Sequence, residues 1–296
     1  MSSSLIYQLF TSTSLFSLGL YHLISTTRNF LKSPQSFSAK PFHPFSLSRF
    51  RLLPLYITIT TLLISSLHHS LSSTTPNPLS PLHLFTSLTS ASISFLFFLI
   101  SLSLLLSEST SLFSLLPYDI FFFLASSAFF LSSSSSSTRS LLLSSDLQSK
   151  LNSTSSTISL LSSILSLILA LFPRLFVVDV GLAASLCLQG MWEFQTGMSL
   201  YVDAFVPEGC HRLLDVVAGV DGSTKCELQE SKDRALAILD LAFVVYVLIV
   251  VVLVFLVYAL VSKALGVSRR LGSYEPLPLA ADTNHVQLKT ITGTQA

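Results

Sequence analysis

The chain has 296 residues, of which half are apolar and a tenth are charged, and its mean hydropathy is +0.69. A soluble domain carries about a quarter charged residues, so this composition leaves too little polar surface for a water-soluble globule. The formal net charge of +1 gives no reason to expect nucleic acid as a partner. The composition predicts an all-α, polytopic integral membrane bundle whose surroundings are the lipid bilayer.

Seven apolar runs have lengths close to the roughly 20 residues that a helix needs to cross a bilayer. In chain order they cover residues 5–24, 52–67, 84–106, 111–131, 154–172, 176–201 and 235–261. Between the first two, Ser25–Arg51 is basic, has no acidic residue and contains prolines, which predicts a loop or an interfacial strip. The serine run Ser132–Ser137 and the polar residues up to about Ser153 predict a flexible connection, because they bury no apolar surface.

Two points of this topology stay open. Abundant Ser and Thr with no acidic residue before Glu108 is typical of a plastid transit peptide, whereas Leu5–Ile24 lacks the features of a cleaved secretory signal. We favour a retained first helix, in an endomembrane or plasma membrane rather than a plastid. The second point is Pro173-Arg174: a tight turn there gives seven spans, and its absence gives six and moves one terminus to the other side.

Basic residues favour the cytoplasmic side of a membrane, and this rule predicts an outside N-terminus and a cytosolic, disordered tail over residues 263–296. The structured loop 202–234 then lies in the oxidising compartment, where a disulfide between Cys210 and Cys226 is expected. The sequon Asn152-Ser153-Thr154 lies on the same side, so Asn152 is a candidate for glycosylation.

The sixth apolar run carries the most polar side chains at membrane depth, where ionisable groups are costly and are candidates for function. Gln189, Trp192 and Gln195 are spaced three apart and form a ridge, and Glu193 lies one turn from Gln189. Such groups either hydrogen-bond between helices as packing contacts or line a polar pathway. By contrast, Asp119, Asp179 and Asp240 lie near the ends of their runs, and we expect water or headgroups to reach them.

No constellation for catalysis, cofactor binding or metal binding is visible. His68 and His69 are adjacent rather than four apart, and the phosphate-loop and hydrolase motifs are absent. We therefore expect a non-enzymatic protein with no cofactor. In the tail, Tyr274-Glu275-Pro276-Leu277 resembles the tyrosine-based sorting signal that adaptor proteins bind, with Tyr274 and Leu277 as its two anchors.

One motif in the sixth run resembles a known family. Leu188-Gln189-Gly190-Met191-Trp192-Glu193-Phe194-Gln195-Thr196-Gly197 is similar to the Leu-Gln-Gly-x-Trp-x-x-Gln-x-Gly signature of the transmembrane protein 45 family, whose plant members carry the domain of unknown function 716. Gly19-Leu20-Tyr21-His22 resembles the end of that family's first helix. Histidines common in the family's third span and after its fourth are replaced here by Ser and Thr. The resemblance implies a seven-helix fold and assigns no biochemistry.

Two functions remain after these observations. The first is a non-enzymatic membrane protein that acts through interaction or trafficking, using loop 202–234 and the tail. The alternative is a small-solute or ion transporter or channel that uses the polar residues of the sixth helix. A receptor is disfavoured, because no charged-aromatic switch motif stands at a helix end.

Overall fold

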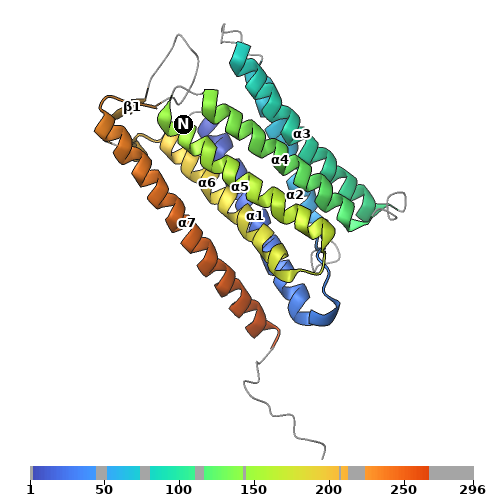
Figure 1. Ribbon diagram of the computed structural model, residues 1–296. Helices are drawn as coiled ribbons and strands as arrows, with labels where there is room; N and C mark the ends of the chain where they lie inside the picture. The colour runs from blue at the N-terminus through green and yellow to red at the C-terminus, as the bar shows by residue number, and fades with distance from the viewer. Residues whose placement is uncertain are drawn as a thin grey trace, which may run out of the picture.

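The computed structural model describes residues 3–44, 52–73, 81–110, 117–142, 145–206, 208–212 and 224–266. Within these ranges the chain forms long helices, one short hairpin and two short 3-10 turns (Figure 1). The helices are α1 (Ser3–Lys32), α2 (Leu53–Ser73), α3 (Pro81–Ser109), α4 (Tyr118–Leu142), α5 (Asp146–Leu171), α6 (Phe176–Tyr201) and α7 (Gln229–Ala264). Strands β1 (Cys210–Arg212) and β2 (Thr224–Cys226) pair antiparallel, so the predicted helical bundle is confirmed apart from this hairpin.

Five of the helices are long and apolar enough to cross a membrane by length and composition, namely α3 to α7. Within the described residues α1 and α2 do not reach that hydropathy, so the spans predicted at 5–24 and 52–67 stay predictions. The chain is therefore a membrane-embedded helical bundle. The turn at Pro173-Arg174 separates α5 from α6, as predicted, and the bounds of α6 agree with the predicted 176–201.

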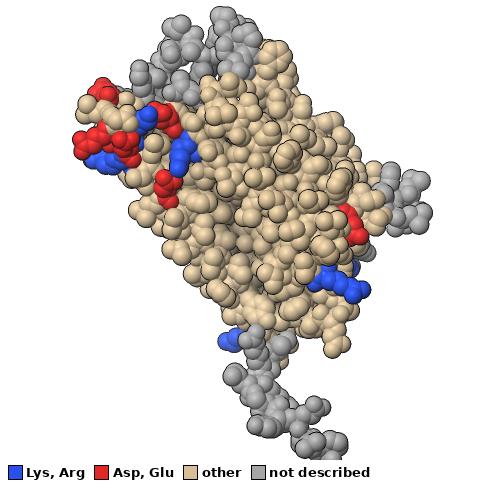
Figure 2. Space-filling view, in the orientation of Figure 1, with Lys and Arg blue, Asp and Glu red and all other residues tan. Residues whose placement is uncertain are grey.

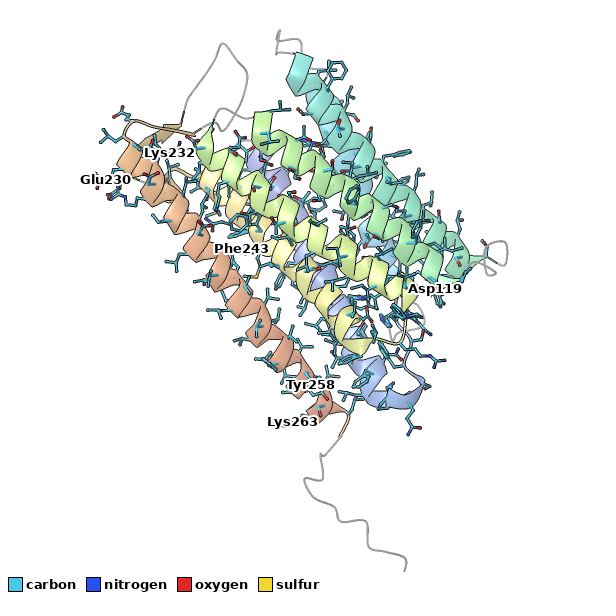
Figure 3. All side chains as sticks on the ribbon, viewed as in Figure 1. Asp119, Glu230, Lys232, Phe243, Tyr258 and Lys263 are labelled. Carbon is cyan, nitrogen blue, oxygen red and sulfur yellow. A yellow bond between two sulfur atoms is a disulfide. The ribbon has the colours of Figure 1, made fainter. Side chains whose placement is uncertain are left out.

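Charge is distributed as a membrane-embedded bundle requires. On the face shown in Figure 2, charged side chains gather at two ends and leave an uncharged belt between them. Figure 3 places Glu230 and Lys232 at the hairpin end, and Asp119 and Lys263 toward the opposite end. Because an exposed charge in hydrocarbon is costly, this belt is the part of the surface suited to lipid tails.

The bundle is built from helix pairs. α1 packs along α6, α2 along α3, and α4 along α5, while α7 lies at one edge against α1, α5 and α6 (Figure 1). The largest core cluster surrounds Trp192, which is fully buried among residues of α5, α6 and α7 such as Leu151, Leu188 and Leu239. This packing places the polar residues of α6 between α1, α5 and α7.

The prediction that Ser25–Arg51 avoids a helix is wrong for its first third, because α1 continues to Lys32. Nothing between Ile24 and Ser33 breaks a helix, and the first proline, Pro34, opens a 3-10 turn at 34–36. The segment after it folds back on the bundle, where Ala39 N donates to Pro173 O at 2.7 Å. The extra two turns of α1 matter below, because they carry Thr26.

The predicted flexible serine tract is also wrong, since α4 runs through Ser132–Ser137 and α5 begins at Asp146. Serine hydroxyls join the two helices: Ser126 Oγ donates to Ser163 O at 2.9 Å, and Ser163 Oγ donates to Ser126 O at 2.8 Å. Ser133 and Ser156 make a similar contact, with 2.9 Å from Ser156 Oγ to Ser133 O. Small side chains let helices approach closely, and here they supply the hydrogen bonds as well.

Candidate functional site

Asp179 lies at the centre of a buried polar cluster between α1 and α6. Its side chain is fully buried, and its Oδ1 is 2.8 Å from His22 Nε2. Thr26 Oγ1 donates to Asp179 Oδ2 at 2.9 Å. His22 and Thr26 are four residues apart on α1, so both face α6, one above the other by about one helical turn. A buried carboxylate is stable only with such partners, and this arrangement supplies one to each oxygen.

His43 completes this cluster from the segment that follows α1. Its Nε2 is 3.3 Å from Thr26 Oγ1, and its ring centroid is 5.5 Å from that of His22. Tyr21 OH donates to the His43 carbonyl and fixes the backbone there. Burial, followed by repulsion from His22, lowers the pKa of His43 from 6.5 to about 4, so its imidazole is neutral at physiological pH.

The cluster corrects the expectation that water reaches Asp179 near a helix end. The predicted first helix ends at Ile24 and therefore does not include Thr26, which hydrogen-bonds to Asp179 in the structure. Asp119 is exposed in the first turn of α4. The side chain of Asp240 is 61% exposed and pairs with Lys150 at 2.7 Å. For these two residues, contact with water or headgroups stays a prediction. Two features of the sequence could have indicated the cluster: His22 and Thr26 are four residues apart on one helix, and Asp179 is an ionisable residue within another apolar run.

A second polar cluster surrounds Glu193, nearer the hairpin end. Gln8 Nε2 donates to Glu193 Oε2 at 2.5 Å, and Ser155 Oγ donates to Glu193 Oε1 at 3.2 Å. Gln189 Nε2 donates to Glu193 Oε1 at 3.0 Å and to Ser155 Oγ at 2.8 Å. The carboxylate is thus held by α1, α5 and its own helix. Arg139 on α4 interacts electrostatically with it.

The four polar residues of the sixth run do not share one face of α6, and the predicted ridge of Gln189, Trp192 and Gln195 is divided between two sets of contacts. Gln189 and Glu193 share the cluster just described. Trp192 Nε1 instead donates to Leu151 O at 3.0 Å, and its ring meets Phe243 of α7 edge to face (Figure 3 labels Phe243). Gln195 accepts from Tyr246 OH at 2.7 Å, also on α7. Trp192 and Gln195 therefore attach α5 and α7 to α6, which is the packing alternative stated above.

Between the two clusters, α1 and α6 touch backbone to backbone through glycines. A Cβ added at Gly190 would lie 2.6 Å from Phe16 N, and one at Gly19 would lie 2.7 Å from Cys187 N. Beyond Glu193, at Gly197, the nearest atom would be a side-chain atom, Gln8 Cγ at 2.8 Å. The glycines of the signature motif thus let the two helices approach closely.

The remaining predicted residues lie away from both clusters. Cys210 and Cys226 form a disulfide across the hairpin, and the free Cys187 is buried. Asn152 lies within α5, where its Nδ2 donates to Gln148 O at 2.9 Å, and its glycosylation stays a prediction. Tyr274 and Leu277 lie outside the described residues.

No group of three His, Cys, Asp or Glu side chains within the described ranges is placed to hold a metal ion. His22, His43 and Asp179 are instead bonded to one another or to Thr26. That arrangement suits proton exchange between neighbouring groups, since a hydroxyl both donates and accepts and an imidazole has two nitrogens.

Comparison with known protein families gives a match over part of the chain. Residues 118–259 match the model of the family of unknown function DUF716, a region that runs from the start of α4 into α7. No curated protein matches the chain. The narrower resemblance to the transmembrane protein 45 family stays a prediction. Residues 118–259, a little less than half of the chain, are thus similar to the DUF716 family, whose function is unknown.

Proposed function

We propose that this membrane protein is an ion transporter whose ion is the proton, carried by the buried carboxylates of α6. The observation that carries the proposal is Asp179, a fully buried carboxylate on an apolar helix that is bonded to His22 and Thr26. Packing alone does not require an ionisable side chain there, and such residues inside membrane helices mark ion and proton pathways.

The second carboxylate extends the argument along the bundle. Glu193 follows Asp179 by fourteen residues on α6, which is about 21 Å along a helix axis. That distance is most of the roughly 30 Å hydrocarbon thickness. The two groups thus occupy opposite halves of the interior, each with partners on α1.

Buried serines on α5 lie between the two carboxylates. Ser155, Ser159, Ser162 and Ser166 follow one another at spacings of three and four residues on one face, and all four are buried. The first donates to Glu193, and Ser162 Oγ donates to Ser185 Oγ at 2.9 Å. The last lines a cavity that His22 also lines. Hydroxyls can relay a proton because each is both donor and acceptor.

The test is proton flux into liposomes that contain the full-length protein and a trapped pH-sensitive dye, driven by a potassium diffusion potential. We expect Asp179→Asn and Glu193→Gln to lower the flux at least about tenfold, with normal abundance. The matched control is Asp240→Asn, which removes an exposed carboxylate from α7 and should leave the flux unchanged.

A packing role for these carboxylates gives a different pattern. It predicts lower abundance for Asp179→Asn and Glu193→Ala, with unchanged flux per folded molecule. A wild-type protein that conducts no more than empty liposomes would refute the proposal outright. The interaction and trafficking alternative rests on loop 202–234 and on Tyr274 and Leu277, and its test is described in the Discussion.

A further inference from the structure

We infer that the cavity lined by α1 to α6 and by residues 41–43 is a binding site for a small monocyclic alcohol or phenol. The inference goes beyond proton transport and does not rest on it. The cavity has a volume of about 170 Å³. Its walls include the aromatic rings Phe42, Phe97, Phe121, Phe122 and Phe129.

The size of the cavity limits its occupant. An apolar cavity of about 150 Å³ in another protein stays free of water and holds benzene. A cavity of about 170 Å³ therefore accommodates one ring with short alkyl substituents. Flat aromatic walls favour a ring, because aromatic pairs gain energy beyond the area they bury.

One atom requires a polar group on that ring. Ser166 lines the cavity and is fully buried, yet its Oγ has no hydrogen-bond partner among the described residues. A buried hydroxyl left without a partner is costly, and nearly all such groups in native proteins find one. A ligand hydroxyl would supply the bond. The end of a lipid acyl chain would fill the same space but would leave Ser166 unsatisfied, so we favour the alcohol.

The histidine side of the cavity fits the same ligand. His22 and His43 line it, and Tyr21 lines it beside them. The Asp179 cluster already fixes the two histidines through Thr26 and the carboxylate. The polar wall is therefore held in place before any ligand arrives, which lowers the entropic cost of binding.

The experiment measures saturable binding of radiolabelled thymol and p-cymene to the purified full-length protein in micelles, with empty micelles as reference. The two probes share one ring and its alkyl groups, and only thymol has the hydroxyl. We expect thymol to bind about five- to tenfold more tightly than p-cymene, as one added hydrogen bond predicts. In Ser166→Ala that preference should disappear, while p-cymene binding stays unchanged.

A second variant tests the location. Ala125 lines the cavity, so Ala125→Leu should fill it and abolish binding of both probes. Ser127 lies exposed two residues further on α4, which makes Ser127→Leu the matched control. Equal affinity for the two probes in the wild type would overturn the inference. So would a preference for thymol that survives in Ser166→Ala, or binding that survives in Ala125→Leu. If Ala125→Leu fails to fold, the comparison of probes in Ser166→Ala still decides.

Discussion

The glycine contact between α1 and α6 predicts a ranking of four alanine substitutions. In Gly190→Ala the new methyl would lie 2.6 Å from Phe16 N and 2.9 Å from Ser12 O. Unstrained non-bonded heavy atoms lie about 3.5–4.0 Å apart, so the backbone of α1 would have to retreat by roughly 1 Å. Gly181 is the matched control on the same helix, because its nearest neighbours would be the Leu165 methyls at 3.6 Å.

The magnitude follows from the difference between these two variants. Both gain the same helix propensity, about 1 kcal/mol, so that gain cancels in the comparison. Overpacking of a close contact costs about 1–3 kcal/mol. We therefore expect the free energy of unfolding of Gly190→Ala to be lower than that of Gly181→Ala by about 1–3 kcal/mol.

The other two glycines complete the ranking. Gly19→Ala also meets backbone, at Cys187 N, and should lose as much stability as Gly190→Ala. Gly197→Ala meets the side chain of Gln8, which can move, so it should lose less.

The assay is unfolding of the full-length protein in mixed micelles by increasing mole fraction of SDS. Trp192 is the only tryptophan of the chain and is buried in the main core, so its fluorescence reports the transition directly. Equal stability of Gly190→Ala and Gly181→Ala would refute the close approach of α1 and α6. A Gly197→Ala variant less stable than Gly190→Ala would refute the distinction between backbone and side-chain neighbours.

Three further predictions concern pH, topology and sorting. The pKa of His43 is lowered from 6.5 to about 4 in the folded protein, so the unfolded chain binds a proton at this residue more readily. The free energy of unfolding should therefore fall as the pH drops from about 6.5 to 4. Thermal unfolding in detergent should show a weaker dependence of stability on pH in His43→Gln than in the wild type. The same dependence in both proteins would contradict this prediction. In a Cys187→Ser background, a membrane-impermeant maleimide should label Cys210 and Cys226 from the outer side, and only after reduction. Labelling from the cytosol without reduction would reverse the predicted orientation. Tyr274→Ala should change the location of a tagged chain in cells by microscopy, and an unchanged location would remove the sorting hypothesis.

Hydropathy was sufficient to predict the helices but not their ends. The run 176–201 agrees with α6 because Pro173 and the polar residue Asp203 lie close to its two ends. The predicted end of α1 at Ile24 lies eight residues before the observed end at Lys32, because Arg28 and Lys32 suggest a loop although neither breaks a helix. Basic residues mark where a helix leaves the membrane, whereas only a breaker such as Pro34 marks where it stops.

The site was predicted in part for the same reason. Glu193 and Gln189 could be paired from their spacing on one helix, since four residues bring side chains together. The cluster around Asp179 depends on His22 and Thr26, more than 150 residues earlier, and local spacing says nothing about that contact. The prediction of a flexible serine tract is wrong for a different reason. A serine-rich composition predicts disorder in water, whereas the serine hydroxyls of α4 and α5 form hydrogen bonds between these two helices.

The attachment of α7 differs between its two halves. Lys232 pairs with Asp146, Asp240 pairs with Lys150, and Tyr246 bonds to Gln195, all in the half that the hairpin joins to α6. Further along, Leu253 and Val257 pack against Leu23 and Ala183. Lipid tails are as apolar as these side chains, so exchanging such contacts for lipid costs little. These three polar contacts thus hold α7 at the end that faces the hairpin, whereas Leu253 and Val257 in its other half pack on apolar residues of α1 and α6.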